Sequence, residues 1–521
     1  MRTAAAVACS CMYALLGTAC IAHSPIRTTD GLNPKAVTPR HCTSDFVDTS
    51  SAELQAPGAD GKAHRADVEC VTYERHKPVT NASSSLPHEG FDLHILEFDD
   101  EGRPWNDAAL DLSLSRLRKQ LDEEPALVVT FIHGWKNNAE VCNGNLCCFR
   151  EVLEVLAKSE REFAGDTQKP RRVIGIYIGW RGGAISLKGL KELTFWGRKH
   201  TAHVVGDNGA VTRVIEQLRE MVVITRDRQS RAGSASGAFA MTSMVTIGHS
   251  FGGALLYSAI ATSLNAQVGK AMEDVAKASS AQAPRTQATQ QPLIADERFV
   301  RILTTGDLFI LLNPAMEASR FSNLNQVRNL RFDGKQVPIF MTLASEFDGA
   351  VGGFFPVGQA FSTLARAARS RDIWFSMEKG FGLYEPFHTH RLVLREFGEV
   401  PAPQSVSGEC RCTSNLAAFG DALIMRLKPL YDLVRTPGSS LPAKAEQLEL
   451  AAYRETLYTR LEPYRDVDPH NPFIMARVDP RVIGGHNDIF NPRFTDFLIE
   501  YLIQTEIKRS LSDDFGTVNP K

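Results

Sequence analysis

The sequence predicts an α/β fold in which helices flank a mostly parallel central sheet. Two continuous apolar runs, residues 126–132 and 172–179, have the composition of strands that are buried on both faces of such a sheet. A third apolar run, residues 244–247, leads through a glycine-rich turn into a helical pattern over residues 254–261. Strands that alternate with helices in this way are typical of α/β proteins.

Composition and charge narrow the classes of function. The 58 basic residues nearly balance the 60 acidic ones, giving a net charge of −2, and no long basic run is interleaved with aromatic residues. Nucleic acid is therefore not an expected partner. The length of 521 residues would fill two or three average domains, but 43% hydrophobic residues also suit one large α/β unit with insertions.

Residues 1–22 are predicted to be a secretory signal peptide. Arg2 is followed by an apolar run over residues 4–19 that is too short to span a membrane comfortably. A buried N-terminal helix is the alternative, but no amphipathic pattern follows the run. The segment that ends at Cys20 loosely resembles a lipoprotein signal, so membrane association through a lipid anchor is a secondary hypothesis. The predicted location is secreted, periplasmic or in the cell envelope.

The ten cysteines indicate possible disulfides, because an exported chain meets an oxidising environment. The candidates are a bridge between Cys42 and Cys70 and one within the loop from Cys142 to Cys148, although spacing alone fixes no connectivity. A metal site at Cys142, Cys147 and Cys148 is the alternative. It is disfavoured because no C-x-x-C pair or neighbouring histidine accompanies these cysteines.

Residues 23–88 are rich in Thr, Ser, Ala, Asp and Pro with little periodicity, which predicts a flexible leader with no catalytic residue. An alternating strand at residues 91–98, expected to be antiparallel, and an exposed helix at residues 108–121 follow. The main domain is predicted to span residues 89–521, and another helix is expected from about residue 203 to 226. Insertions are expected near residues 181–203, 265–295 and 353–465, the last one forming a cap outside the sheet.

The turn Gly248-His-Ser-Phe-Gly252 lies between a predicted strand and a predicted helix. This is the pattern of a nucleophile elbow, which holds a serine in a strained conformation with its hydroxyl above the sheet. The glycines allow the strand and the helix to approach closely. Because the bare pattern is short, its position between strand and helix is what makes Ser250 the candidate nucleophile. His249 is expected to point away and pack.

The strand at residues 126–132 runs into His133-Gly134-Trp135. Loops at this position in serine hydrolases supply backbone N–H groups that bind the oxyanion of a tetrahedral intermediate. The predicted donors are the N–H groups of Trp135, or a close neighbour, and of Phe251. An ordinary turn at a strand end is the alternative interpretation.

Two later loops supply a candidate acid and a candidate base. A strand at residues 337–344 ends before Asp348, which is the preferred acid, and Glu346 is the alternative on the same loop. His486 lies between a last predicted strand, residues 472–478, and a closing amphipathic helix.

Other histidines compete for the role of base. His388 and His390 come soon after the acid loop and are the second choice. They would also be able to ligate a metal as an HxH pair, but spacing places no third ligand, so no metal site is predicted. Trp180, Phe195 and Trp196 follow a strand end, where they are predicted to line a hydrophobic substrate pocket. Their alternative role is to pack this long connection onto the body.

These motifs resemble the α/β-hydrolase superfamily, in its serine esterase and lipase branch, over roughly residues 90–510. The resemblance is to poorly characterised bacterial members with HGW and GHSFGG motifs, and the order Ser, acid, His is that of the family. It implies that Ser250 attacks an acyl carbonyl, that His486 transfers the proton, and that Asp348 fixes the imidazole tautomer. It also implies a small-molecule or lipid ester substrate, a covalent acyl-enzyme and no cofactor. The alternatives are a thioesterase or acyltransferase with the same triad, and a catalytically silent binding protein at the cell surface.

Overall fold

The structure is a computed structural model of the chain. It describes residues 26–27, 47–49, 71–77, 90–165, 169–181, 195–207, 209–231, 241–281, 300, 302, 307–334, 336–348, 370–395, 412, 416–435, 456, 458–464 and 466–511. The predicted signal peptide with Cys20, and the proposed pair Cys42 and Cys70, lie outside these residues.

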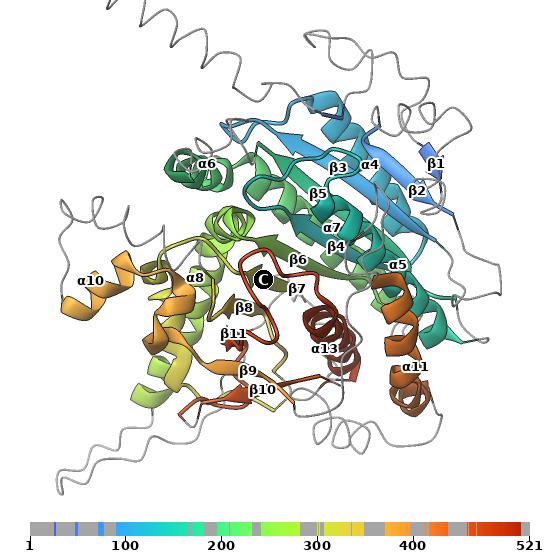
Figure 1. The fold of residues 1–521 in the computed structure, drawn as a ribbon. Coiled ribbons are helices and arrows are strands. Elements are labelled where there is room, and N and C mark those ends of the chain that lie inside the picture. The colour runs from blue at the N-terminus through green and yellow to red at the C-terminus, as the bar shows by residue number, and fades with distance from the viewer. Residues whose placement is uncertain are drawn as a thin grey trace, which may run out of the picture.

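One sheet of 11 strands organises the described residues, in the order β1-β2-β3-β5-β4-β6-β7-β8-β11-β9-β10 (Figure 1). Neighbouring strands are parallel all the way from β3 to β9, whereas the pairs β2–β3 and β9–β10 are antiparallel. The predicted mostly parallel sheet is therefore confirmed. The strands are β1 (Val47–Thr49), β2 (Tyr73–His76), β3 (Phe91–Phe98), β4 (Ala126–Ile132), β5 (Arg172–Trp180), β6 (Ser243–His249), β7 (Asp307–Leu312), β8 (Phe340–Ser345), β9 (His390–Leu394), β10 (Thr459–Pro463) and β11 (Phe473–Val478).

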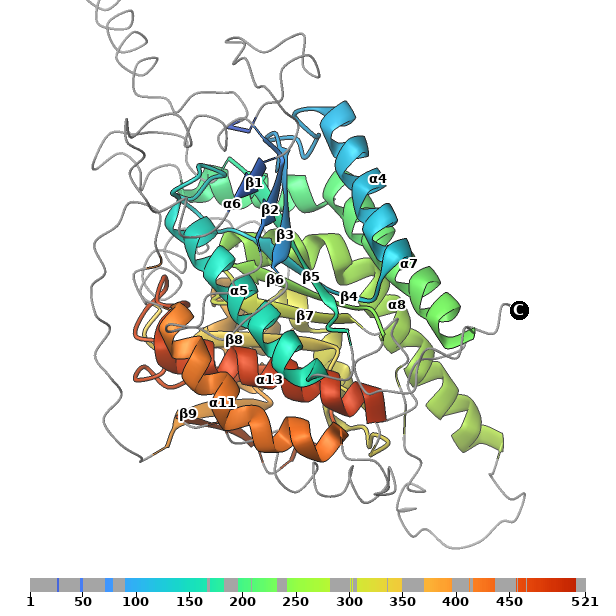
Figure 2. The same ribbon diagram turned by 90° about the vertical axis from the view of Figure 1, so that its right-hand side faces the viewer.

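Helices cover both faces of the sheet, as Figure 2 shows. Along β4, Leu127 and Val129 pack into the core on one face, and Val128 and Ile132 pack into the core on the other. This alternation buries every residue of the strand. The first face carries α5 (Gly144–Ala164), α11 (Leu416–Arg435) and α13 (Pro492–Leu511), and the second carries α4 (Asp107–Glu123), α6 (Phe195–Asp207), α7 (Ala210–Arg231) and α8 (Phe251–Ala281).

Shorter helices complete the described elements. They are α10 (Arg371–Glu378) and the 3₁₀ turns η2 (Ala318–Phe321), η3 (Leu324–Asn329), η5 (Phe381–Leu383) and η6 (Glu385–Phe387). The η5 turn packs beside the end of β8, since a Cβ on Gly382 would lie 2.8 Å from that of Ala344.

The prediction of a flexible leader over residues 23–88 is wrong for the segments that the structure describes. Strand β2 pairs with β3, and the side chain of Glu74 within it is fully buried. The sequence of β2 is too polar to read as a core strand. The negative charge of Glu74 is neutralised by Arg150 of α5, whose guanidinium lies 2.8 Å from the Glu74 carboxylate. β3 itself is antiparallel to β2, as expected, but parallel to β5.

Two predicted insertions also contain regular structure. Helix α8 continues to Ala281, well into the segment 265–295 that was expected to be an insertion. Strands β9 and β10 extend the sheet within residues 353–465, although this region was expected to form a cap. Each strand has an exposed second residue and two half-buried residues at its end, and neither has the continuous apolar pattern of the central strands. The helix expected near residues 203–226 is divided into α6 and α7.

A disulfide joins Cys148 of α5 to Cys412, which precedes α11, across 264 residues of sequence. The expected bridge within the loop from Cys142 to Cys148 is therefore wrong: Cys147 is a buried free thiol, and Cys142 forms a separate disulfide. The disulfide between Cys148 and Cys412 ties a segment far along the chain to the helix beside the predicted oxyanion loop.

Candidate active site

Ser250, His486 and Asp348 meet above one edge of the sheet. The Ser250 hydroxyl donates to Nε2 of His486 over 2.6 Å, and Nδ1–H of His486 donates to the Asp348 carboxylate over 2.7 Å. The three residues follow β6, β11 and β8, whose parallel alignment brings their carboxyl ends to the same edge. A hydroxyl, an imidazole and a carboxylate in this order can transfer a proton away from the serine oxygen.

The backbone at Ser250 has a φ of 57°, in the left-handed region that non-glycine residues rarely adopt. Hydrogen bonds hold it there: the Ser250 N–H donates to Leu312 of β7, and its carbonyl accepts from Ala315. A Cβ on Gly248 would lie 2.6 Å from the carbonyl of Gly252, and a Cβ on Gly252 would lie 2.2 Å from that of Ile132. The two glycines are needed because the turn packs backbone directly against backbone.

The loop after β4 packs directly on the serine. A Cβ on Gly134 would lie 2.7 Å from the Cβ of Ser250, so a larger residue would push this loop away. Trp135 is the next residue, and its ring centroid is 6.4 Å from that of Phe251. Phe251 begins α8, whose amino-terminal end is favourable for a developing negative charge. The two predicted oxyanion donors thus lie on segments that flank the serine.

Trp180 packs against the predicted oxyanion loop, whereas it was predicted to line a substrate pocket. It is only 3% exposed, its indole N–H donates to the His133 carbonyl over 2.8 Å, and its backbone N–H donates to His133 Nε2 over 3.1 Å. Burial lowers the pKa of His133 to about 4, so the ring is neutral and Nδ1–H donates to the Gly134 carbonyl. Phe195 and Trp196 begin α6, but their side chains lie outside the described part of the structure.

The competing acid and bases have other partners. Glu346 forms ion pairs with Arg477 at 3.0 Å and with Arg391 at 3.4 Å, so its carboxylate faces the strand ends of β11 and β9. His388 is buried and bonds the Phe381 carbonyl through Nε2, while Nδ1 of His390 contacts the Thr389 hydroxyl. His486 and Asp348 are the histidine and carboxylate that form the hydrogen-bonded chain with Ser250.

No family model, curated protein or solved structure matches this chain. Across the described ranges, no group of three or more His, Cys, Asp or Glu residues is placed to hold a metal ion, and no helix is long and apolar enough to cross a membrane.

Asn313, which the sequence did not single out, and His249 together hold His486 in place. The His486 carbonyl accepts from Asn313 Nδ2 and from His249 Nε2, each over 2.9 Å. Asn313 also accepts from the Ser345 N–H over 2.8 Å, so it ties the acid loop to the histidine loop. Burial, and next the nearby charge of His486, lower the pKa of His249 to about 3, which keeps its ring neutral with the proton on Nε2. His249 packs as expected, but against His486.

The sequence offers one faint signal for Asn313. It directly follows the buried strand β7 and precedes a proline, and asparagine tolerates the left-handed conformation better than most residues. Its φ is 43°. The contacts with Ser345 and His486, however, depend on two loops that are distant in sequence, and no local pattern reports them.

If the site hydrolyses esters as the sequence predicts, replacing Asn313 by alanine is expected to lower kcat by about 10- to 100-fold with little change in KM. The hydrogen bonds that the Asn313 side chain donates to the His486 carbonyl and accepts from the Ser345 N–H would be lost, and small misplacements of reacting groups are costly. Steady-state kinetics would measure this. Asn313→Gly is the matched control for backbone strain, because glycine adopts a positive φ freely. A glycine variant with wild-type kcat would show that the side-chain contacts are dispensable.

Proposed function

We propose that this protein is a serine hydrolase of carboxylic esters with an α/β-hydrolase fold. The proposal rests on a single observation, the hydrogen-bonded chain from Ser250 through His486 to Asp348, with contacts of 2.6 and 2.7 Å. The mostly parallel sheet supports it, as does the position of each of the three residues on the segment that follows a strand. The strained φ of Ser250 is what a nucleophile elbow requires.

In the proposed reaction, the Ser250 oxygen attacks the carbonyl carbon of the ester while His486 Nε2 accepts the hydroxyl proton. Asp348 accepts the Nδ1–H bond and stabilises the positive charge that develops on the ring. The backbone N–H groups of Trp135 and Phe251 bind the oxyanion. His486 then gives its proton to the departing alcohol, leaving an acyl-enzyme, and water activated by the same imidazole releases the acid. Each proton that is taken up is returned, so the enzyme ends unchanged.

A thioesterase or an acyltransferase would use the same groups and differ only in the leaving group or in the acceptor of the acyl group. A binding protein on the same fold would have no use for an aligned Ser–His–Asp chain, so the two short contacts favour an enzyme. The disulfide between Cys148 and Cys412 supports the proposed export to an oxidising compartment. The proposed substrate is a small-molecule or lipid ester.

The proposal is tested by measuring turnover of p-nitrophenyl esters of increasing acyl chain length, with matched acyl thioesters as a second series. Ester turnover is expected, together with complete inactivation by one equivalent of a fluorophosphonate per chain. Adding an alcohol as acceptor separates hydrolysis from acyl transfer through the products formed. A folded protein that reacts with neither the esters, the thioesters nor the fluorophosphonate would refute the proposal.

A further inference from the structure

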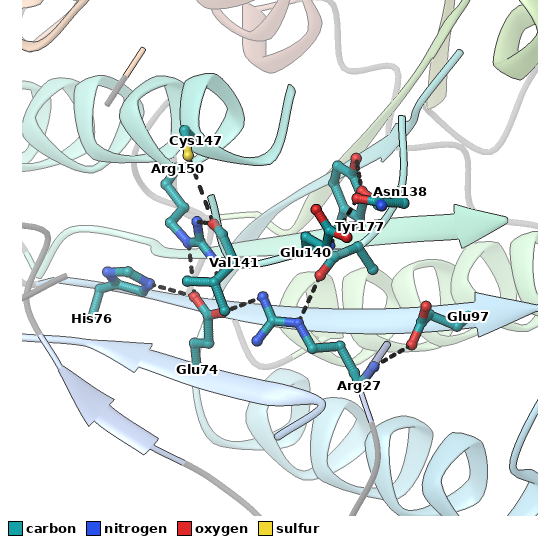
Figure 3. Close-up of polar contacts among 11 residues, drawn as sticks. Arg27, Glu74, His76, Glu97, Asn138, Glu140, Val141, Cys147, Arg150 and Tyr177 are labelled. Atoms are coloured by element: carbon teal, nitrogen blue, oxygen red, sulfur yellow. Dashed lines mark hydrogen bonds and ion pairs between the residues drawn. The ribbon is translucent and has the colours of Figure 1, made fainter. Parts of the chain in front are cut away.

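A dipeptide of the leader, Ile26-Arg27, is built into the body of the protein. The backbone N–H of Ile26 lies 3.1 Å from both carboxylate oxygens of Glu97 on β3, and the N–H of Arg27 donates to the same carboxylate over 2.7 Å. The Arg27 side chain is buried, and its Nε donates to the carbonyl of Ala139 over 2.8 Å. Figure 3 shows this arginine between Glu97 and Glu74.

The segment that Arg27 reaches is the continuation of the oxyanion loop. Ala139 lies four residues after Trp135. Its neighbours are held as well: the Tyr177 hydroxyl donates to the Asn138 carbonyl over 2.9 Å, and Arg150 donates to the Val141 carbonyl over 2.7 Å. Three successive anchors therefore fix this stretch of backbone, and one of them comes from the leader (Figure 3).

Buried charge couples the leader to this stretch. The Glu74 carboxylate binds Arg150 through two hydrogen bonds of 2.9 and 2.8 Å and lies 3.4 Å from Arg27. Burial alone would raise the pKa of Glu74, but Arg150, a hydrogen bond with His76 and the charge of Arg27 lower it well below its ordinary value. Burial raises the pKa of Glu97 to about 6, against the opposing effect of the Ile26 and Arg27 amides. Without Arg27, Glu74 would lose one of the two guanidinium groups beside it.

We propose that Ile26-Arg27 is a positioning element of the active site, whose docking fixes the oxyanion loop through the bond from Arg27 to Ala139. This inference rests on the proposed function and extends it to the leader. The predicted export signal ends at residue 22, so the dipeptide would stay with the exported chain. Arg27 acts at a distance from the reacting atoms, through the backbone that carries Trp135. Its loss is therefore expected to weaken binding of the transition state more than binding of the substrate.

The test compares Arg27→Ala and Arg27→Lys with Arg75→Ala as a matched control. Arg75 lies on β2 beside Glu74, but its side chain is 50% exposed and contacts Tyr73 and Asp92. Both Arg27 variants are expected to lower kcat about tenfold or more with KM within twofold, because the oxyanion donor is displaced. Lysine keeps the charge but lacks the planar fork that serves Ala139 and Glu74 together. The Arg75 variant is expected to match wild type.

Inhibition by a boronic acid provides a readout that a purely structural role would not change, because its tetrahedral adduct with serine places an oxygen in the oxyanion site. The Arg27 variants are expected to weaken this inhibition by the same factor as kcat. N-ethylguanidinium is expected to restore part of kcat and part of the boronic acid inhibition in Arg27→Ala. It is expected to change neither quantity in Arg27→Lys or in Arg75→Ala. If Arg27→Ala does not fold, Arg27→Lys, which keeps the charge and most of the stem, carries the comparison.

Two results would overturn the inference in distinguishable ways. Variants at Arg27 that melt at a lower temperature yet keep wild-type kcat and boronate inhibition would show that the dipeptide only stabilises the fold. A folded wild-type protein that neither turns over esters nor binds the boronic acid would refute the proposed function and, with it, this role for the leader.

Discussion

Ser250→Ala is expected to lower kcat for ester hydrolysis by a factor of about 10⁴ or more and to abolish labelling by a fluorophosphonate. The variant loses the atom that would form the acyl-enzyme, whereas His486 and Asp348 remain paired over 2.7 Å. Only binding and the oxyanion donors would then act on the substrate. Steady-state turnover of a p-nitrophenyl ester and the intact mass of the treated protein measure the two effects.

A second serine–histidine contact provides the control for this experiment. The Ser258 hydroxyl on α8 lies 2.9 Å from Nδ1 of His203. Burial, with the charge of Arg320 next in importance, lowers the pKa of His203 to about 3, which makes it a poor base. Ser258→Ala is therefore expected to keep full labelling and turnover. Labelling that persists in Ser250→Ala and disappears in Ser258→Ala would identify Ser258, and not Ser250, as the nucleophile.

The central strands and the three aligned side chains were predictable because each has a local signal. A continuous apolar run marks a strand buried on both faces, and β4 is buried along its whole length. Ser250, Asp348 and His486 each follow such a run. Since parallel strands end at a common edge, their proximity follows once the strands are recognised.

The remaining features depend on contacts between distant segments, which leave no local pattern. Strand β2 is polar and reads as leader, because Arg150 on α5 neutralises its buried Glu74. Trp180 is the last residue of β5, where a pocket residue could lie, but its indole N–H donates to the carbonyl of His133, on the loop after β4. The role of Asn313 likewise requires both the Ser345 N–H and the His486 carbonyl. The residue type alone, aromatic for Trp180 and polar for Asn313, does not distinguish a residue that holds a loop in place from one that lines a substrate pocket.

Asp348→Asn is expected to lower kcat by about 10³- to 10⁴-fold. Asp348 accepts the Nδ1–H bond of His486 over 2.7 Å, which leaves the lone pair of Nε2 facing the serine hydroxyl. An asparagine can turn its amide N–H toward Nδ1 and so hold the opposite tautomer, with a proton on Nε2 where a base is needed. Steady-state turnover of a p-nitrophenyl ester, measured from acidic to alkaline pH, shows how far kcat falls and whether the loss is the same at every pH.

Glu346→Gln is the matched control, because it removes a carboxylate from the same loop, two residues away. Glu346 is ion-paired with Arg477 and Arg391, so its loss should leave kcat within about twofold while weakening the attachment of the loop to β9 and β11. Opposite results, with Glu346→Gln inactive and Asp348→Asn active, would assign the acid to Glu346. Such a loop would have to rearrange on substrate binding, because it is Asp348 that the structure places against the imidazole.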